Sequence, residues 1–387
     1  MSKNNPHFSP TPFIRGVNIG AWLVLEKWIT PSVFEGTDAV DQWTFDATPG
    51  ARDKLTTHWS TFFDQTELRR IADTGINALR IPIGYWAYDN TGTPYLSGAD
   101  AYLERAVHWA RESHLKVWID LHGAPGSQNG NNHSGRAGSM DWQEDDNLQK
   151  TIDALIKIAT KYGTSAYGDV IIGIELINEP SSWGKNNFTK TKSWTIQAYR
   201  AVRAATQNTK LQLIMHDSFQ PAANWSDVLS QLFGQRGKFA MDTHPYQLYT
   251  DADNALNQDE HVSKACAWST SLFKPYHDAR IPVYAGEWSA NSNVCVNPDG
   301  STLNGTSSSQ ICKVAGCQCV ADTDPDNWSV HTKTQVRRYV DAQLQTFEKW
   351  SNGYFFWNWK GPGGWNFLNG VAQGWIPSPI SSFAKVC

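Results

Sequence analysis

The sequence contains the stretch IELINEP at residues 174–180, an apolar run that ends at an amide, a carboxylate and a proline. A second run of this kind, VYAGEW at residues 283–288, also carries a glutamate near its end. Short apolar runs bounded by polar residues are typical of strands that are buried on both faces. Carboxylates at the ends of two such strands can meet at one mouth of a barrel.

Eight apolar or β-rich runs recur along the chain, and amphipathic helical patterns separate most of them. The expected strands are 15–20, 78–84, 116–123, 170–179, 211–218, 239–249, 282–289 and 354–360. The expected helices are 66–74, which begins at a capping Thr66, and 99–114, 147–162, 192–207 and 332–350. This alternation predicts an α/β fold, a single (β/α)8 TIM barrel over residues 1–387 with residues 1–12 as a flexible arm. A doubly wound open sheet is the alternative, but no glycine-rich phosphate loop follows the first strand.

Two long segments interrupt this alternation, and both are expected to be long loops, one after strand 1 and one after strand 7. Residues 33–60 follow the first strand, and residues 291–329 are rich in serine, glycine and asparagine and hold four of the six cysteines. Loops of this length in a compact domain are usually functional or disordered. We expect a disulfide-stapled loop beside the functional site.

Composition limits the partners and the compartment. With 33 basic and 37 acidic residues and no basic stripe, the chain is not expected to bind nucleic acid. An apolar run of about 18 residues, which a membrane span needs, does not occur, and residues 1–12 lack the apolar core of a signal peptide. Six cysteines and five glycosylation sequons favour an oxidising compartment and a secreted protein. The spacing of Cys317 and Cys319 is wrong for a zinc site, so no metal is expected.

Polar or titratable side chains occur at nearly every predicted strand end, where the active site of a barrel lies. They are Arg80, Asp120, His122, Asn178, Glu179, His216, Asp217, Asp242, His244, Tyr246, Glu287, Trp357 and Trp359. Packing explains one such residue but not a set at seven strand ends. The content of 19 tryptophans adds a reason to expect a sugar, because the apolar face of a pyranose stacks on aromatic rings.

Glu179 and Glu287 are the expected catalytic pair, because glycoside hydrolysis uses two carboxyl groups. A separation of about 5 Å would indicate retention of configuration, and about 6.5–9.5 Å inversion. Arg80 is expected to pair with Glu287 and keep it ionised, while Tyr246 donates a hydrogen bond to the same carboxylate. The pKa values of the two carboxyls would thereby separate.

Two residues beside Glu179 complete this interpretation. Asn178 is placed to hold a sugar 2-hydroxyl group. Glu175 lies four residues before Glu179 and therefore points the same way, but lower in the barrel. We expect Glu175 to be a buried, paired structural carboxylate.

The chain resembles the fungal exo-β-1,3-glucanases of glycoside hydrolase family 5 from about residue 14 to residue 359. The motifs that carry the resemblance are RGVNIGAWLVLE at 15–26, RIPIGYW at 80–86, WIDLHGAPGSQNG at 118–130, NEP at 178–180 and Gly286-Glu287. The resemblance implies a cofactor-free, monomeric retaining β-glucosidase acting on β-glucans or β-glucosides.

The same resemblance implies a role for each matching residue. Glu179 would be the acid/base and Glu287 the nucleophile. The sugar at the cleavage site would be surrounded by Arg80, His122, Asn178, His244, Tyr246 and Trp359, and Glu26 and Trp28 would bind the non-reducing terminal glucose and close the pocket. It also implies the disulfides Cys266–Cys387 and Cys295–Cys319, which leave Cys312 and Cys317 as a local pair.

Two departures from the family pattern fall where the leaving group is expected to bind. Asn131 replaces a usual aromatic residue, and GPGG at residues 361–364 replaces a usual Thr-Glu. A β-1,6-glucanase or a flavonoid diglycosidase of the same family therefore stays an alternative. Two alternatives of other classes are a carbohydrate-binding pseudoenzyme and a metal hydrolase, whose ligands would come from His122, His216, Asp217, Asp242 and His244.

Overall fold

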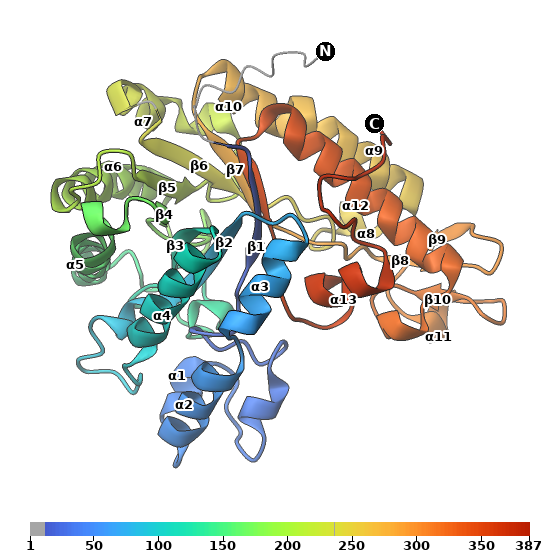
Figure 1. The fold of residues 1–387 in the computed structure, drawn as a ribbon, viewed down its shortest axis with the longest axis horizontal. Helices are drawn as coiled ribbons and strands as arrows, with labels where there is room; N and C mark the ends of the chain where they lie inside the picture. The colour runs from blue at the N-terminus through green and yellow to red at the C-terminus, as the bar shows by residue number, and fades with distance from the viewer. Residues whose placement is uncertain (1–11, 236) are drawn as a thin grey trace.

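The structure is a computed structural model that describes residues 12–235 and 237–387. Eight parallel strands close a barrel in the order β1-β11-β7-β6-β5-β4-β3-β2, with helices around it (Figure 1). The strands are β1 (Ile14–Asn18), β2 (Ala78–Gly84), β3 (Lys116–Gly123), β4 (Ile171–Glu175), β5 (Gln212–His216), β6 (Phe239–Thr243), β7 (Val283–Trp288) and β11 (Gly353–Phe356). The predicted (β/α)8 barrel is confirmed. Most of the predicted N-terminal arm, residues 1–11, lies outside the described residues.

Strand β4 shows why some predicted strands were too long. It ends at Glu175, four residues before the predicted end. Leu176 and Ile177 are still fully buried, so the apolar run continues into the loop. The chain then turns, and Glu179 adopts a left-handed backbone with φ of 42°. Apolar periodicity reports burial and not hydrogen bonding, so it cannot locate this end.

The five predicted helices lie close to their predicted positions, and one further long helix, α9, was not predicted. The long ones are α3 (Gln65–Asp73), α4 (Ala99–Glu112), α5 (Asp145–Tyr162), α6 (Phe188–Ala205), α9 (Gln258–Trp268) and α12 (Val330–Trp350). The prediction that Thr66 caps α3 is wrong. Asp64 is the N-cap, because its side chain accepts a hydrogen bond from the Glu67 amide at 2.9 Å.

The floor of the barrel interior is apolar, and the polar site lies above it. Side chains of seven strands form a separate buried cluster, in which the Trp118 ring meets Tyr284 and Phe355 edge-on. The Arg80 guanidinium lies 6.0 Å from the centroid of the Trp118 ring. This plug closes the barrel below Arg80, so the functional side chains can be reached only from the carboxyl ends of the strands.

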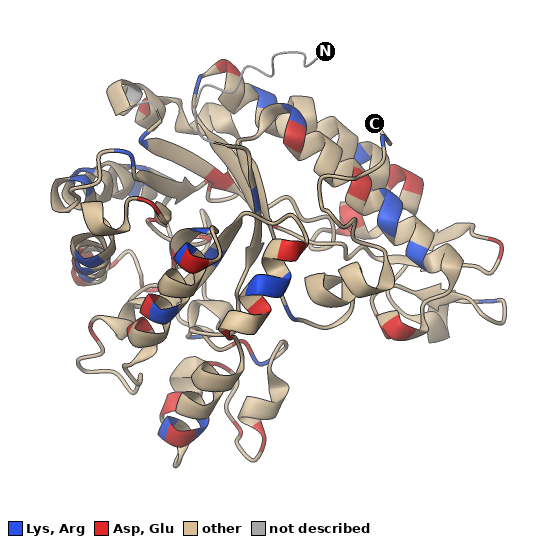
Figure 2. Cartoon of the chain, in the orientation of Figure 1, with Lys and Arg blue, Asp and Glu red and all other residues tan. Residues whose placement is uncertain are grey.

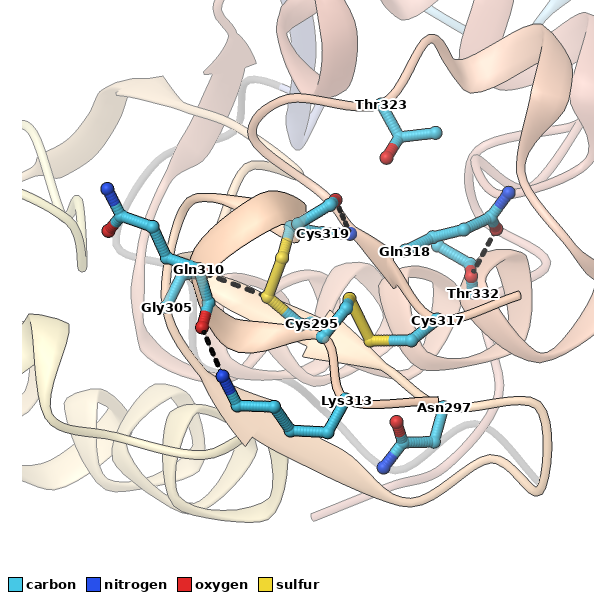
Figure 3. Close-up of a disulfide and its surroundings, with 12 residues drawn as sticks. Cys295, Asn297, Gly305, Gln310, Lys313, Cys317, Gln318, Cys319, Thr323 and Thr332 are labelled. Atoms are coloured by element: carbon cyan, nitrogen blue, oxygen red, sulfur yellow. Dashed lines mark hydrogen bonds between the residues drawn. A yellow bond between two sulfur atoms is a disulfide. The ribbon is translucent and has the colours of Figure 1, made fainter. Parts of the chain in front are cut away.

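The segment after β7 forms a small disulfide-linked subdomain (Figure 3). It contains the sheet β10-β8-β9, made of β10 (Gln318–Cys319), β8 (Val294–Val296) and β9 (Thr302–Asn304). Cys295 is bonded to Cys319, its partner across the sheet, and Cys312 to Cys317. Cys266 on α9 is bonded to Cys387. These are the three pairs that the family resemblance implies.

The segment after β1, expected to be a long loop at residues 33–60, contains two helices, α1 (Gln42–Asp46) and α2 (Ala51–Thr61). Further short helices are α7 (Ser226–Gln231), α8 (Asp251–Asn254), α10 (Lys274–Asp278), α11 (Ser308–Ile311) and α13 (Phe367–Gln373). Basic and acidic residues are interspersed along the helices (Figure 2). In the described part of the chain, no helix combines the length and apolar character that a membrane crossing needs.

Candidate active site

A cavity of about 740 Å³ opens at the carboxyl ends of the barrel strands. Its lining includes seven of the predicted site residues, namely Glu26, Trp28, His122, Glu179, His244, Tyr246 and Glu287. It also includes residues that were not predicted as site residues, namely Asn132, His133, Trp183, Phe219, Tyr249, Thr250, Asp253 and Trp365. The lining is completed by Asn131, which was expected on the side of the leaving group, and by Trp357, which was expected at the end of a strand. Strand β7, which carries Glu287, and the loop after β4, which carries Glu179, therefore bring the two predicted catalytic glutamates into one pocket.

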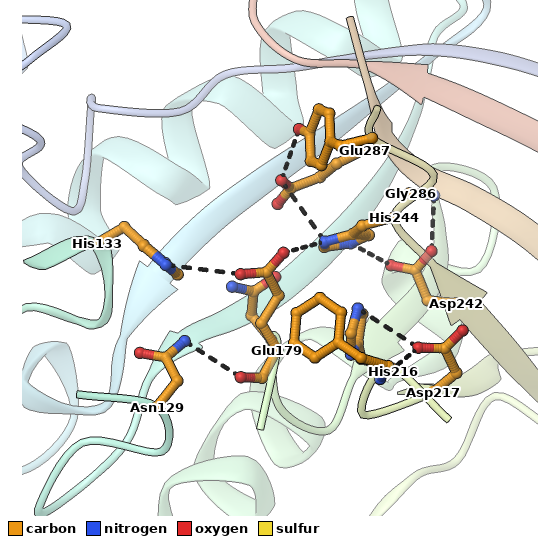
Figure 4. A network of polar contacts seen from close by, with 12 residues as sticks. Asn129, His133, Glu179, His216, Asp217, Asp242, His244, Gly286 and Glu287 are labelled. Carbon is orange, nitrogen blue, oxygen red and sulfur yellow. Dashed lines mark hydrogen bonds and ion pairs between the residues drawn. The ribbon is translucent and has the colours of Figure 1, made fainter. Parts of the chain in front are cut away.

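One imidazole nitrogen lies between the two glutamates (Figure 4). His244 Nδ1 is 2.6 Å from Glu179 Oε1 and 3.6 Å from Glu287 Oε2. One oxygen of each carboxylate thus lies against the same nitrogen, and retaining glycosidases hold their two carboxyl groups closer together, at about 5–5.5 Å, than inverting ones do. The geometry therefore suits retention.

Arg80 fixes Glu287 from below. The guanidinium is fully buried and donates to Glu287 Oε1 at 3.0 Å and to Asn178 Oδ1 at 2.8 Å. It also pairs with Glu175 at 2.8 Å and with Asp120 at 3.2 Å. Glu175 is thus the buried, paired carboxylate that we expected. Arg80 is not among the residues that line the cavity, so it positions Glu287 and Asn178 from beneath.

The pKa of Glu287 is raised and that of Glu179 is lowered. We expected the opposite, with Glu287 as the carboxyl that stays ionised. Burial and the neighbouring Glu179 raise the pKa of Glu287, although His244 and Arg80 oppose this. Burial also raises the pKa of Glu179, but the hydrogen bond and charge of His244 outweigh it and hold this pKa below its usual range. Arg80 pairs with Glu287 and Tyr246 donates to it, as expected, but burial and Glu179 together raise the pKa of Glu287 despite Arg80 and His244.

His244 carries the charge because both of its nitrogens face carboxylates. Nδ1 contacts Glu179, and Nε2 lies 3.2 Å from Asp242 Oδ2. Burial lowers the pKa of His244, but these carboxylates and Glu287 raise it well above its usual value. Glu179, His244 and Glu287 therefore share their protons and titrate as one unit.

Several buried polar atoms in this region have no hydrogen-bond partner among the described residues, and Glu26 Oε1, His122 Nε2 and Asn178 Nδ2 are among them. The second oxygen of Glu26 accepts from Trp28 Nε1 at 2.9 Å, and His122 Nδ1 lies 2.6 Å from Asp120. Buried polar groups in folded proteins are nearly always satisfied. These three atoms are therefore suited to bind the hydroxyl groups of a ligand.

Three of the predicted sugar contacts, Arg80, Asn178 and Trp359, are not among the residues that line the cavity. Trp359 does not line the cavity, because its ring turns outward and its Nε1 donates to Glu67 on α3 at 3.2 Å. Trp357 lines the cavity instead, with its ring stacked on His122 at 5.5 Å and an interplanar angle of 9°. The prediction chose the wrong tryptophan of the pair, and Trp357 offers the aromatic face.

Gln128 joins the loops that follow β3 and β4. Its side-chain amide donates to the carbonyl oxygens of His122 at 2.8 Å and Asn178 at 2.9 Å. The neighbouring Asn129 donates to the carbonyl oxygen of Glu179 at 3.1 Å. These bonds hold the left-handed turn that aims Glu179 into the pocket.

The long loop after β7, residues 291–329, contributes none of the cavity's lining. The Ala290 amide, directly before this loop, donates to the Gly364 carbonyl at 3.2 Å, and Asn293 donates to the Leu248 carbonyl, beside the lining residue Tyr249, at 3.4 Å. Trp365 packs against Trp28 and Tyr246 with centroid separations of 5.5 and 5.3 Å. The GPGG segment thus lies at the Trp28 end of the pocket, whereas we expected it where the leaving group binds.

Comparison with known proteins agrees with this chemistry. Residues 42–317 match the Cellulase family (glycosyl hydrolase family 5). The protein is a glycoside hydrolase with a TIM-barrel fold. The chain belongs to glycoside hydrolase family 5.

Among its relatives is the probable glucan 1,3-beta-glucosidase A of Aspergillus fumigatus strain CBS 144.89. The two are 38% identical over 97% of this chain and 89% of the relative. The glucan 1,3-beta-glucosidase 2 of Wickerhamomyces anomalus is also 38% identical, over 95% of this chain and 88% of the relative. The crystal structure of a rutinosidase from Aspergillus niger covers 94% of this chain and 97% of its own, with a TM-score of 0.71 and 21% identity, which supports the shared fold.

Proposed function

We propose that this enzyme is a secreted, retaining exo-β-1,3-glucanase that releases glucose from the non-reducing ends of β-glucans. The observation that carries the proposal is the pair of glutamates on one histidine nitrogen. The pocket beside them has Glu26 and Trp28 in its wall. The names of the relatives support the β-1,3 linkage.

In the first step of the proposed mechanism, Glu287 attacks the anomeric carbon and the glycosidic bond breaks. The leaving oxygen takes a proton from Glu179, and a covalent glycosyl-enzyme forms. Arg80 and Tyr246 each lie 3.0 Å from an oxygen of Glu287 and hold it for this attack. In the second step water attacks the same carbon, the bond to Glu287 breaks, and Glu179 takes the proton from the water.

His244 would supply the proton that Glu179 needs. In the free enzyme this proton resides on His244, which is 2.6 Å from Glu179 Oε1. When Glu287 becomes esterified, its negative charge disappears, so one of the carboxylates that keep His244 charged is lost. The proton of His244 can therefore pass through Glu179 to the leaving oxygen in the first step, and the proton that Glu179 takes from water in the second step can return to His244.

The three unpartnered atoms would recognise the glucose ring. His122 and Glu26 line the cavity, Glu26 at its Trp28 end, and the buried Asn178 directly precedes Glu179 in the chain. We assign Asn178 to the 2-hydroxyl and Glu26 to hydroxyls of the terminal glucose. A terminal sugar that satisfies Glu26 would leave no room for a further unit, which would enforce attack from the chain end.

Product analysis on laminarin, pustulan and rutin side by side tests the substrate. We expect glucose as the early product from laminarin, with slow loss of polymer viscosity. A rapid viscosity drop with mixed oligosaccharides would contradict exo attack. Faster cleavage of pustulan would move the preference to β-1,6 linkages, and release of a disaccharide from rutin faster than glucose from laminarin would indicate a diglycosidase.

Three further properties belong to this proposal. The three disulfides support an oxidising, extracellular location. The protein is expected to act as a monomer and without a metal. Ligand atoms of Glu179, His216 and His244 lie within 4.8 Å of one another, so a chelator is the needed control. Full activity in the chelator supports the glycosidase, and loss of activity would favour the metal hydrolase.

A further inference from the structure

Two exposed aromatic rings form one surface at the end of the pocket away from Glu26. Trp183, in the loop after β4, is 54% exposed, and Phe219, in the loop after β5, is 43% exposed. Their ring centroids are 5.3 Å apart with an interplanar angle of 45°, and both residues line the cavity. We call this pair the Trp183–Phe219 platform. Strands β4 and β5 lie across the barrel from β1 and β11, whose loops carry Trp28 and Trp365.

Hydrogen bonds tie the two loops of the platform together. Ser182 Oγ donates to the Ser218 carbonyl at 2.9 Å, and Gln220 Nε2 donates to Ser182 Oγ at 2.8 Å. Each bond joins the loop after β4 to the loop after β5, directly beside one of the two rings. The rings are therefore held in a fixed relation before any ligand arrives.

The backbone of the platform is strained in a way that presents Phe219. Ser218 and Phe219 are consecutive non-glycine residues with left-handed φ values of 55° and 59°. The strained turn is stabilised by His216 Nδ1 and Asp217 Oδ1, which accept from the amides of Ser218 and Phe219 at 3.0 and 2.8 Å. Such strain persists where the surroundings enforce it, and it is concentrated at functional sites.

The Trp183–Phe219 platform lies on the same side of the pocket as Glu179, the proposed acid/base. Trp183 follows Glu179 by four residues in the same loop, and a general acid must face the departing oxygen of the leaving group. Phe219 contacts His216, whose ring is 4.4 Å from that of His244, the partner of Glu179. The leaving group therefore departs past these rings.

We infer that Trp183 and Phe219 bind the leaving group, and that Trp183 determines which leaving groups are accepted. The class of ligand is a ring with a flat apolar face, either a second sugar unit or an aryl aglycone, because both stack on aromatic rings. The same surface receives an acceptor once the glycosyl-enzyme has formed. This inference rests on the proposed retaining mechanism.

The transfer step can be written in full. The hydroxyl oxygen of an acceptor on the platform forms a bond to the anomeric carbon. The bond between that carbon and Glu287 breaks, and the hydroxyl proton passes to Glu179. Water does the same without the platform, so the ratio of transfer to hydrolysis reports acceptor binding at Trp183 and Phe219.

The test measures this ratio for wild type, Trp183→Ala and Trp183→Tyr, with an activated aryl β-glucoside as donor. The acceptors are glucose, 2-phenylethanol and methanol, and methanol is too small to need the rings. We expect Trp183→Ala to lower transfer to at least one of the two ring acceptors about tenfold, with methanol transfer unchanged and partial recovery in Trp183→Tyr. Loss with glucose alone identifies a sugar as the natural occupant, and loss with 2-phenylethanol alone identifies an aryl group.

Val330→Ala is the control, because Val330 is a 78% exposed apolar residue at the start of α12, outside the cavity lining. It should leave all three ratios unchanged. Unchanged ratios for both ring acceptors in Trp183→Ala, or an equal fall with methanol, would overturn the platform alone. A wild-type enzyme that cleaves no β-glucoside would overturn the proposed function as well, so the two failures are distinguishable.

Discussion

The β1–β11 end of the pocket and its β4–β5 end differ in the kind of surface that they offer. At the first end Glu26 is 2% exposed and has an oxygen without a partner. At the second end Trp183 and Phe219 are about half exposed, and the faces of their rings can be covered without forming a hydrogen bond. A buried polar atom rejects a ligand that does not satisfy it, whereas a stacking surface accepts many rings. The comparison indicates an enzyme that is strict about the sugar and tolerant about the leaving group.

The largest effect is expected between the two ends, at Glu287. Glu287→Gln should lower kcat more than about a thousandfold for every substrate, because no glycosyl-enzyme can form. Binding of a terminal glucoside should persist, since Glu26 is untouched, and calorimetry with a substrate checks this. Azide should rescue Glu287→Ala and give a product of inverted configuration. More than a few per cent of residual activity in Glu287→Gln would contradict its role as nucleophile.

Glu179→Ala should produce the next largest effect, and it should divide the substrates by leaving group. Activity on glucans should fall by about 10²–10⁴-fold, the usual contribution of general acid catalysis. Activated aryl glucosides should lose far less in the first step, because they need little protonation. Rates of glycosyl-enzyme formation from both substrate types measure the difference, and equal losses would refute the assignment of Glu179 as the acid.

Glu26→Gln should lower kcat/KM by about tenfold or more, by the same factor whatever the leaving group. Its pH dependence gives a sharper test. Burial raises the pKa of Glu26 to about 7, so the carboxyl is neutral below that pH. Sugar hydroxyls that donate to the carboxylate favour its ionised form, so KM should rise as pH falls below about 7.

The Gln variant should lose this part of the pH dependence, because its amide does not titrate. KM measured from pH 5 to pH 8 in both proteins isolates the contribution of Glu26. A dependence that is identical in wild type and variant would show that another group causes it.

The smallest effect is expected from restoring a ring at the leaving-group end. Asn131→Phe should add a further aromatic face to those of Trp183 and Phe219 and change kcat/KM by less than about tenfold, within the range of one stacking contact. We expect a gain for β-1,3-glucan oligosaccharides and a loss for bulky aryl glucosides. Matched assays on laminaribiose and a flavonoid glucoside measure the ratio, and a change in the opposite sense would place Asn131 outside the leaving-group site.

The barrel and the catalytic residues at the strand ends could be predicted because local sequence encodes them. Buried parallel strands leave apolar runs, and a polar residue at the end of such a run has few structural explanations. Glu179, His244 and Glu287 all follow this rule. Trp357 and Trp359 do not, because both lie past the end of β11, where a loop and not the alternation of a strand sets the side-chain direction.

The aromatic residues of the leaving-group end, Trp183 and Phe219, were not predicted, since they come from loops without periodicity. Trp183 lies in a serine- and glycine-flanked segment, and that setting for a large aromatic residue was the available signal. The exposure of Phe219 could not be predicted, because it depends on the left-handed backbone conformation of Ser218 and Phe219, which no sequence pattern indicates. The sequence also could not show that the disulfide-linked subdomain leaves the cavity lining to other loops. Loop length shows that a segment is unusual but not which surface it covers.

The order of strands in the closed barrel has a consequence for how this enzyme can diversify. Glu26 and Trp183 belong to loops on opposite sides of the ring and do not share a strand, so their substitutions should combine additively. Trp183 and Phe219 contact each other and are joined through Ser182 and Ser218, so their substitutions should be epistatic. Lineages descended from such a barrel can therefore exchange one leaving group for another by altering neighbouring loops together, while the recognition of glucose is inherited unchanged.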